Sequence, residues 1–284
     1  MRIFVTGGTG FLGSHFLKKA YASSHRAAAI RRPGSQPRIP LDMQPTWLDG
    51  DLEKDWTSEL AQCRTLVHFA AAGVPPRKAE WPELFDVNVR QSVQLWHRAI
   101  AAGVKRLIIC GCGSEYGKAG ERTDFIKVEL APEPADAYAV SKVAATMAAM
   151  SLAVEKKVEV IVLRPFEVYG DGQPETCFWN SLRKAAVAGE DFAMTPGEQI
   201  RDFIAGEKVA EAFVNAIVRN DLKPGEPKIE NVASGRPQTL RAFAEHYWTI
   251  FGAKGRLKVG ARPARPDEVK RFIPAVRTDA PMWL

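Results

Sequence analysis

The chain has 284 residues, of which 46% are hydrophobic and 25% charged, and its formal net charge is +6. This length suits one large core, or a dinucleotide-binding domain with a smaller second lobe. No apolar run approaches the ~20 residues that a membrane helix needs, so we expect no membrane association. No run of Lys and Arg exceeds two residues. The basic excess therefore indicates anionic small molecules as ligands rather than nucleic acid.

The sequence begins with a short apolar strand that runs straight into a glycine loop, so we expect no signal peptide. Its four cysteines are scattered without the spacing of metal ligands: Cys63, Cys110, Cys112 and Cys177. We therefore expect no metal site, reduced thiols and a cytoplasmic location.

Strand-like runs alternate with helical segments over the first 165 residues. Several of these runs are almost continuously apolar, as in strands that are buried on both faces. The predicted strands are Arg2–Thr6, Ala27–Ile30, Thr46–Leu48, Thr65–Ala70, Arg106–Cys110 and Val158–Leu163. Repeated strand–helix units predict an α/β fold with a Rossmann-type, doubly wound parallel sheet.

The regular alternation of strand-like and helical segments ends after Pro165. Residues 1–170 are predicted to form an NAD(P)-binding domain, and residues 171–284 a smaller, mostly α-helical lobe that binds substrate. Within the second part, residues 205–235 are expected to return to the main sheet through a helix at Lys208–Arg219 and a strand at Ile229–Val232. A further helix is predicted at Phe178–Ala188.

A glycine loop follows the first strand and opens a helix. Gly7 allows the tight turn, Gly10 lets the backbone approach a pyrophosphate, and Gly13 lets the helix pack closely on the strand. Phe11 and Leu12 lie in the same loop. The position of this loop, between a strand and a helix, predicts a dinucleotide site.

The end of the second predicted strand indicates which dinucleotide is used. An acid there would bind the ribose hydroxyls of NAD, whereas this chain has Arg31, Arg32 and Ser35, which suit the 2′-phosphate of NADP. We expect NADP, with NAD as the alternative. Asp51 and Leu52 follow the third strand, where an acid can accept a hydrogen bond from the adenine amino group.

Tyr138 and Lys142 form a Tyr-x-x-x-Lys pattern. On a helix, residues four apart face the same way. An ammonium beside a phenol would lower the pKa of the phenol, so that Tyr138 could serve as general acid or base at a carbonyl or hydroxyl group. Lys142 is also expected to hold the nicotinamide ribose.

The sequence resembles the extended short-chain dehydrogenase/reductase family, in its nucleotide-sugar branch, over nearly its whole length. The matching segments are Thr6–Gly13, Asp51-Leu52, His68–Ala71, Asn88-Val89, Ser114–Gly117, Tyr138–Lys142, Leu163–Gly170, Arg201–Ile204 and Asn231–Gly235. The resemblance implies a nucleotide-sugar-like substrate. It also implies a homodimer formed by two helices, at about 82–102 and 138–155.

The same resemblance implies roles for individual residues. Ala70 and Ala71 would line the cofactor, and Asn88 would brace the site. The backbone around Pro165 and Val168 would meet the nicotinamide amide. The substrate diphosphate would be held by two arginines, Arg201 and Arg265.

Two residues depart from the family pattern. The catalytic hydroxyl of the family falls at Cys112, four residues before Tyr116, so either the weaker thiol takes that role or Ser114 replaces it. Glu167 stands where relatives usually carry Asn, which alters the substrate contacts.

Three chemistries share this scaffold. Dehydratases place an acid pair directly after the catalytic hydroxyl, whereas Gly113 and Ser114 follow Cys112 here, which argues against dehydration. The arginine pair favours an NADP-dependent reductase of a nucleotide-linked keto sugar, with hydride transfer to a ketone, at C4 by preference. The alternatives are an NAD-dependent 4-epimerase and a non-catalytic NADP-binding protein.

Overall fold

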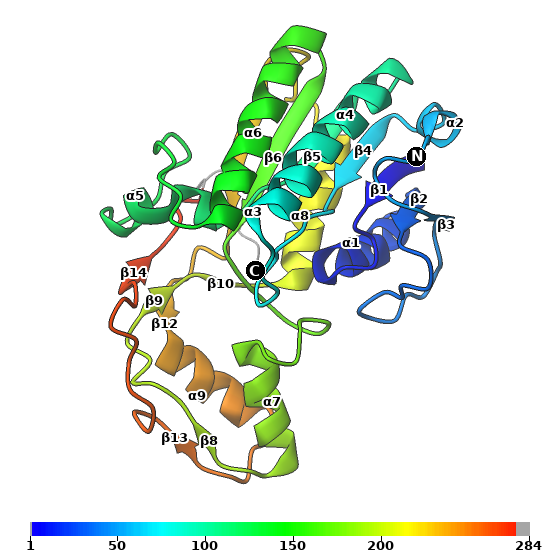
Figure 1. Cartoon of the computed structure of the whole chain (residues 1–284). Helices are drawn as coiled ribbons and strands as arrows, with labels where there is room; N and C mark the ends of the chain where they lie inside the picture. Colours follow the sequence, from blue (N-terminus) through cyan, green and yellow to red (C-terminus); the bar gives the residue numbers. More distant parts are fainter. Residues whose placement is uncertain (1, 277–284) are drawn as a thin grey trace.

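The computed structural model describes residues 2–276, and within them a seven-stranded, all-parallel sheet forms the centre of the molecule (Figure 1). The strand order is β11-β6-β5-β4-β1-β2-β3, and the order reverses beside β1, where the sheet turns from one half to the other. The strands are β1 (Arg2–Thr6), β2 (Arg26–Arg31), β3 (Thr46–Asp49), β4 (Thr65–His68), β5 (Arg106–Cys110), β6 (Glu159–Pro165) and β11 (Lys228–Val232).

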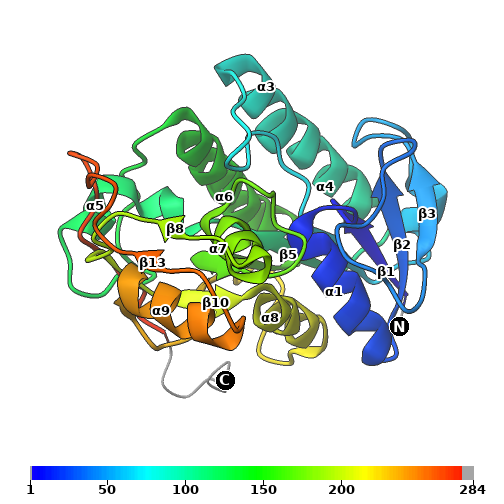
Figure 2. The same ribbon diagram turned by 90° about the horizontal axis from the view of Figure 1, so that it is seen from below.

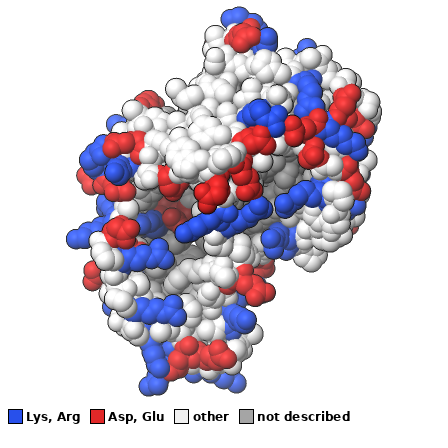
Figure 3. All heavy atoms as spheres, viewed as in Figure 1, with Lys and Arg blue, Asp and Glu red and all other residues white. Residues whose placement is uncertain are grey.

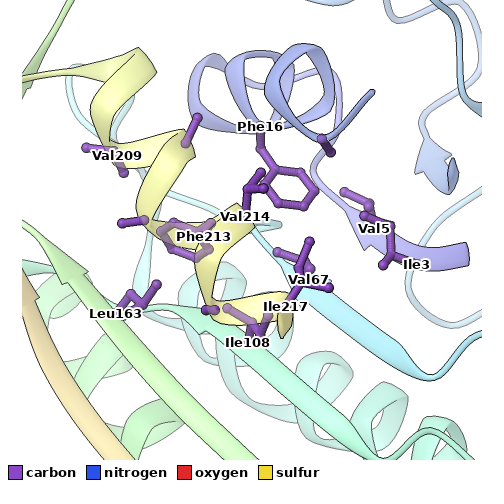
Figure 4. Packing of buried hydrophobic residues seen from close by; sticks show 14 of the residues in the cluster. Ile3, Val5, Phe16, Val67, Ile108, Leu163, Val209, Phe213, Val214 and Ile217 are labelled. Carbon is purple, nitrogen blue, oxygen red and sulfur yellow. The ribbon is translucent and has the colours of Figure 1, made fainter. Parts of the chain in front are cut away.

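Helices cover both faces of the sheet, which confirms the predicted doubly wound α/β fold (Figure 2). One face is covered by α1 (Phe11–Ala22) and α8 (Gly206–Val218). The other face is covered by α2 (Thr57–Leu60), α4 (Ser92–Ala101) and α6 (Ala137–Lys156). Figure 4 shows the first interface, where Phe16 of α1 and Phe213 of α8 point at Val67 and Ile108 of the sheet. The strands are therefore buried on both faces, as their apolar runs predict.

The predicted helix over 82–102 is interrupted in the structure. It consists of α3 (Trp81–Phe85), a π-helical turn over Asp86–Gln91, and α4. The wider turn shifts the register, so that Asn88 and Ser92 are buried whereas Gln91 is only partly buried. The hydroxyl of Ser92 donates to the carbonyl of Val87 at 2.8 Å. Such π turns are frequent at functional sites.

Helix α6 is long and apolar enough to span a membrane by length and composition alone, with a mean hydropathy of 1.4 over its most apolar window. This differs from the expectation that no segment reaches that length. The helix packs one face on the sheet through Ala145, Ala149 and Leu152, and it carries the buried Lys142. We therefore assign it as a core helix, since core helices meet the same criterion.

Most of the chain after β6 forms a smaller lobe beside the carboxyl ends of the strands (Figure 1). It contains α7 (Phe178–Ala188) and α9 (Leu240–Ile250), which pack around Leu182 and Ala244. Short strands complete it: β7 (Glu167–Tyr169) with β10 (Phe203–Ala205), β8 (Phe192–Ala193) with β13 (Leu257–Lys258), and β9 (Ile200–Arg201) between β12 (Gln238–Thr239) and β14 (Arg271–Phe272). The small helix α5 (Gly117–Glu121), from the first part of the chain, contacts β14.

Between the two halves of this lobe, the chain returns to the main sheet. Strand β11 pairs in parallel with β6, and α8 packs beside α1. The side chain of Arg106, at the start of β5, donates to the carbonyl oxygens of Ala216, Ile217 and Arg219, at 2.5–3.0 Å. These carbonyls belong to the C-terminal end of α8, so Arg106 caps that helix from the sheet.

Candidate active site

The glycine loop has the geometry of a phosphate cradle. Gly7 has φ +67°, and a Cβ there would lie 2.7 Å from the backbone N of Ala70, so the turn requires glycine. A Cβ on Gly13 would lie 2.1 Å from the carbonyl oxygen of Gly7, so only glycine lets α1 start this close to the strand. By contrast, a Cβ on Gly10 would meet only the Gly7 carbonyl, at 3.2 Å.

The first turn of α1 is open to an anion. No side chain caps this helix, and its first turn contains no acidic residue. The N–H groups of the first turn, around Phe11 and Leu12, have no partner within the helix. Free N–H groups and the helix dipole together favour a phosphate, so the residues present fit the pyrophosphate of a dinucleotide.

The end of β2 presents a fixed and a free arginine. Arg31 donates from Nε to Oδ1 of Asp49 at 2.7 Å, and its guanidinium lies 5.2 Å from the ring centroid of Trp47. Arg32 is exposed, and Ser35 closes a turn onto the carbonyl of Arg32 at 2.5 Å. One of the two arginines predicted to meet a 2′-phosphate is thus already paired with a carboxylate.

The acid predicted to meet adenine has a structural task as well. Asp51 Oδ1 accepts hydrogen bonds from the backbone N–H groups of Glu53 and Lys54 at 2.9 and 3.0 Å. Asp51 is exposed and the neighbouring Leu52 is buried. The roles of both residues toward adenine stay predictions.

Tyr138 and Lys142 lie one turn apart in the first half of α6, but the lysine does not bind the phenol. Its Nζ donates to the carbonyl oxygen of Cys110 at 2.6 Å, at the end of β5. Burial, with the nearby Cys112 and Cys110 thiols, raises the pKa of Tyr138 well above its usual value. The predicted lowering of this pKa is therefore wrong for the protein without ligands, because desolvation dominates and the ammonium is directed elsewhere.

Asn88, on the π turn, braces the same region. Its side-chain amide donates to Ser141 Oγ at 2.9 Å and accepts from the backbone N of Ala72 at 2.7 Å. Ser141 in turn donates to the carbonyl of Tyr138 at 2.7 Å. These hydrogen bonds therefore link the segment after β4 to the helix that carries Tyr138.

The loop after β5 holds Cys112 and Ser114 together. Cys112 Sγ lies 2.9 Å from Ser114 Oγ, and burial raises the pKa of the Cys112 thiol. Both candidates for the family hydroxyl therefore occupy one place, where Cys112 is near enough to Tyr138 to help raise the pKa of the phenol.

Glu115 fixes this loop from beneath, a role that the sequence analysis missed. Its Oε1 accepts from the backbone N of Cys112 at 2.9 Å, and its Oε2 accepts from Thr146 of α6 and from Arg164 of β6, each at 2.9 Å. Glu115 and Arg164 are both fully buried, and the Arg164 guanidinium lies 4.6 Å from the ring centroid of Tyr116. Glu115 therefore faces away from the substrate side, which agrees with the argument against dehydration.

A cavity of about 280 Å³ opens in front of this loop, between the sheet and the smaller lobe. Its wall includes five of the predicted site residues: Cys112, Ser114, Pro165, Glu167 and Arg201. Ala139 of α6, next to Tyr138, also lines it. Figure 3 shows acidic and basic side chains intermingled over this side of the molecule, with a row of basic side chains across its middle.

Glu167 and Arg201 face each other in the cavity. Arg201 Nε lies 3.8 Å from Glu167 Oε1, and desolvation raises the pKa of Glu167 although the Arg201 charge opposes this. Arg201 is anchored by donating to the carbonyls of Ile200 and Val269 at 2.9 and 2.7 Å. Arg265 lies on an exposed turn outside the cavity wall. Of the two arginines predicted to bind the diphosphate, the structure therefore brings only Arg201 to the cavity.

The remaining cofactor candidates lie along the strand ends between these two sites. Ala70 donates its backbone N–H to Thr6 Oγ1 at 3.2 Å, next to the glycine loop, and Ala71 follows it. Val168 lies in β7, and its carbonyl accepts from Gln173 at 2.7 Å. The segment 69–72, the glycine loop and the end of β6 thus share one edge of the sheet, where ligands bind in open α/β folds.

A second buried acid, also missed, connects two matched motifs. Asp202 is fully buried and accepts hydrogen bonds from the backbone N–H groups of Ser234 and Gly235 at 2.7 and 2.8 Å. Its backbone neighbour is Arg201, so this contact positions the arginine. The sequence contains both segments, 201–204 and 231–235, as family motifs. Their separation along the chain does not predict that they contact each other.

A glycine-loop Rossmann domain with Tyr-x-x-x-Lys at the sheet edge defines an NAD(P)-dependent enzyme of the short-chain dehydrogenase/reductase type. Comparison with protein families names the family: residues 3–233 match the NAD dependent epimerase/dehydratase family, and the chain belongs to it. This confirms the extended family that the sequence resembles. The alternative of a non-catalytic NADP-binding protein is therefore set aside.

Known relatives include both reductases and epimerases. The chain is 27% identical over 277 residues to the GDP-6-deoxy-D-mannose reductase of Pseudomonas aeruginosa, covering 93% of this chain and 84% of that protein. It is 25% identical over 286 residues to the UDP-glucose 4-epimerase of Corynebacterium glutamicum, covering 93% and 84%. A solved structure of MoeE5 in complex with UDP-glucuronic acid and NAD superposes with a TM-score of 0.80 at 27% identity, covering 98% of this chain and 90% of that one.

Proposed function

We propose that the protein is an NADP-dependent reductase that converts the ketone of a nucleotide-linked keto sugar, at C4, into a hydroxyl group. The observation that carries the proposal is the end of β2, which offers Arg31, Arg32 and Ser35 and no acid at the position where NAD-dependent relatives bind ribose hydroxyls. The reductase among the relatives supports the reaction.

In this reaction, the chain binds the substrate in the cavity and delivers a proton. The phenol of Tyr138, kept protonated by its raised pKa, donates that proton to the ketone oxygen. Cys112 or Ser114 donates a hydrogen bond to the same oxygen as negative charge develops on it. NADPH, when bound, supplies the hydride.

Lys142 has a positioning role in this scheme. Its ammonium, anchored on the Cys110 carbonyl, lies at the sheet edge, where it can hold the nicotinamide ribose and stabilise the tyrosinate after proton transfer. The tyrosinate then takes a proton from water, which restores the phenol. Arg201 is placed to bind the substrate diphosphate, whereas the exposed Arg265 would need to move to do so.

One observation favours the alternative, an NAD-dependent 4-epimerase. Arg31 is paired with Asp49, which reduces the positive charge available to a 2′-phosphate. Epimerases predominate among the relatives that we compared. An epimerase would use Tyr138 as base and then as acid, with no net consumption of cofactor.

A single-turnover experiment separates the two. The protein is mixed with NADPH and a 4-keto nucleotide sugar, and separately with NAD and 4-hydroxy nucleotide sugars. Stoichiometric loss of NADPH absorbance with formation of the alcohol supports the reductase. Interconversion of the 4-epimers without net change of the cofactor would replace it with the epimerase.

We further propose that residues 1–170 together with 205–235 form the cofactor domain, and that the rest of 171–284 binds substrate. Residues 277–284 lie outside the described part of the chain. All four cysteines are free thiols, which supports a cytoplasmic enzyme. Exposed Met147 and Val154 on α6, at 60% and 50%, support a homodimer formed by this helix and the segment 82–102, which spans α3, the π turn and α4.

A further inference from the structure

The wall of the substrate cavity carries more negative than positive charge. Among the described residues, the carboxylates of Glu121, Asp136 and Glu167 line it, against the guanidinium of Arg201. Asp136 has another task, since it caps α6 by accepting from the backbone N of Ala139 at 2.8 Å. Glu121 lies at the end of α5, whereas Glu167 faces Arg201 in the cavity. Glu167 is therefore the acid that lies beside the arginine proposed to bind the substrate diphosphate.

The backbone around Glu167 is well fixed. Glu167 begins β7, where it pairs with Phe203 of β10 in parallel register. The preceding residue, Phe166, donates its backbone N–H to the carbonyl of Val232 at 3.2 Å. The Glu167 side chain is 51% exposed and lines the cavity, so it is accessible to a ligand there.

Arg201 does not satisfy this carboxylate. Its two anchoring bonds to Ile200 and Val269 hold the guanidinium so that Nε is 3.8 Å from Glu167 Oε1, beyond hydrogen-bond distance. The carboxylate oxygens therefore remain available as acceptors toward the cavity. An ionised carboxylate only accepts hydrogen bonds, so it needs a ligand group that donates them.

We propose that Glu167 is a specificity-determining residue, which makes the cavity accept sugars with hydroxyl or amino groups and reject sugars that carry a carboxylate. The proposal rests on the proposed function, since it takes the sugar of a nucleotide sugar as the occupant. Hydroxyl and ammonium groups donate to Glu167, whereas a uronate carboxylate offers no donor and has the same charge. In a cavity of about 280 Å³ the two carboxylates would lie close together, and such like-charge placement strongly disfavours binding.

The charge effect can be measured without knowing the substrate, because Cys112 lines the same cavity. The Cys112 thiolate displaces iodide from iodoacetate, which is anionic, or from iodoacetamide, which is neutral. Both reagents need the same thiolate, so the ratio of the two rates cancels any change in its ionisation. We expect Glu167→Gln to raise the iodoacetate-to-iodoacetamide ratio at Cys112 by about three- to tenfold, because the variant removes a negative charge from the wall of the same cavity.

The controls are built into the chain. Cys177, at the start of α7, reports the ratio outside the cavity and should not change. Glu207→Gln removes an exposed carboxylate that does not line this cavity, and it should leave the ratio at Cys112 unchanged. Rates are read for each cysteine by mass spectrometry of the full chain after digestion. An unchanged ratio at Cys112 in Glu167→Gln overturns the proposal, whatever reaction the enzyme catalyses.

A second measurement tests selection among nucleotide sugars. Calorimetry of the cofactor-loaded protein compares UDP-glucose, UDP-glucosamine and UDP-glucuronate. We expect wild type to bind the first two at least about tenfold more tightly than the uronate, and Glu167→Gln to bring the three affinities close together. Equal affinities in wild type overturn the role of Glu167 and leave the proposed function standing. If none of the three binds while the Cys112 ratio rises, the charge barrier at Glu167 stands and UDP sugars are excluded as substrates.

Discussion

The Nζ of Lys142 lies 2.6 Å from the carbonyl oxygen of Cys110, so the lysine of the Tyr-x-x-x-Lys pair is anchored to the end of β5 rather than to the tyrosine. The phenol of Tyr138 is buried near two thiols, and this environment raises its pKa. The free protein therefore holds a neutral proton donor beside a buried ammonium.

Tyr138→Phe should abolish turnover and leave cofactor affinity nearly unchanged. The phenol hydroxyl is the proposed proton donor, and general acid catalysis contributes about 10²–10⁴-fold. Single-turnover kinetics gives the rate and calorimetry gives the affinity. Cys112→Ser should keep or raise the rate, because a hydroxyl donates to a developing alkoxide better than a thiol does. Turnover like that of wild type in Tyr138→Phe would remove the site assignment.

The cofactor preference depends on how Asp49 shares Arg31. Arg32→Ala should weaken NADPH binding by about 1.5–3 kcal/mol, since it removes a charge-assisted contact to the 2′-phosphate. Asp49→Asn should instead strengthen NADPH binding, because it frees Arg31 and removes a like charge. NADH affinity serves as the control and should change little in both variants. Equal NADH and NADPH affinities in wild type would favour the epimerase.

The buried pair Glu115–Arg164 should be costly to break. Glu115→Ala leaves the guanidinium of Arg164 buried without its charge partner, which lowers the free energy of unfolding by about 3–5 kcal/mol. Denaturant titration measures this. The control is Arg122→Ala, which breaks the exposed pair with Glu133 and should cost no more than about 1 kcal/mol. Similar losses in both variants would contradict the structural role of Glu115.

Stability should fall in mild acid because of His68. Burial lowers the pKa of this histidine to about 3, and its ring lies 2.9 Å from Thr6 Oγ1 and 3.0 Å from Ser92 Oγ. The unfolded chain takes up a proton below its ordinary pKa of 6.5, whereas the folded chain stays neutral until about 3. Between these values the unfolded state binds more protons, so stability drops as pH falls, by up to about 1.4 kcal/mol per pH unit.

His68→Asn should flatten this slope between about pH 6 and about pH 4.5, whatever its effect on absolute stability. Thermal or denaturant unfolding at several pH values gives the slope. His246→Asn, at an exposed position of α9, is the matched control and should keep the wild-type slope. Parallel slopes for wild type and His68→Asn would exclude the buried imidazole as the cause.

The proposed dimer should depend on the outer face of α6. Met147→Glu puts a charge in the middle of this face and should shift the protein to monomers in light scattering at about micromolar concentration. Val187→Glu, at an exposed position of α7, tests for a general effect of added charge and should leave the dimer intact. A wild-type monomer at the same concentration would contradict the proposed interface.

The sheet could be predicted from sequence because its strands are buried on both faces. Strands Arg2–Thr6 and Arg106–Cys110 begin and end where the apolar runs do, and the glycine loop marks the first crossover. The strand predicted for Thr65–Ala70 ends at His68, since Phe69 and Ala70 turn to bond the backbone and hydroxyl of Thr6. That contact is between distant residues and leaves no local pattern.

The site was predictable only where one segment carries it. Tyr138 and Lys142 lie one turn apart on a single helix, so their spacing placed them correctly, although the partner of the lysine comes from β5. The π turn at Asp86–Gln91 and the buried contacts of Glu115 and Asp202 depend on packing between segments far apart in the chain. A local spacing rule contains no information on such contacts.

The return of α8 and β11 to the main sheet after the first half of the smaller lobe has a consequence for synthesis. When residue 170 leaves the ribosome, the β6 edge has no partner strand and the apolar face around Phe16 and Val67 is not yet covered by α8. Exposed edges of this kind invite association with other chains. The nascent protein must therefore protect this face, by delay or by a chaperone, until Val232 has emerged and Arg106 can close on the end of α8.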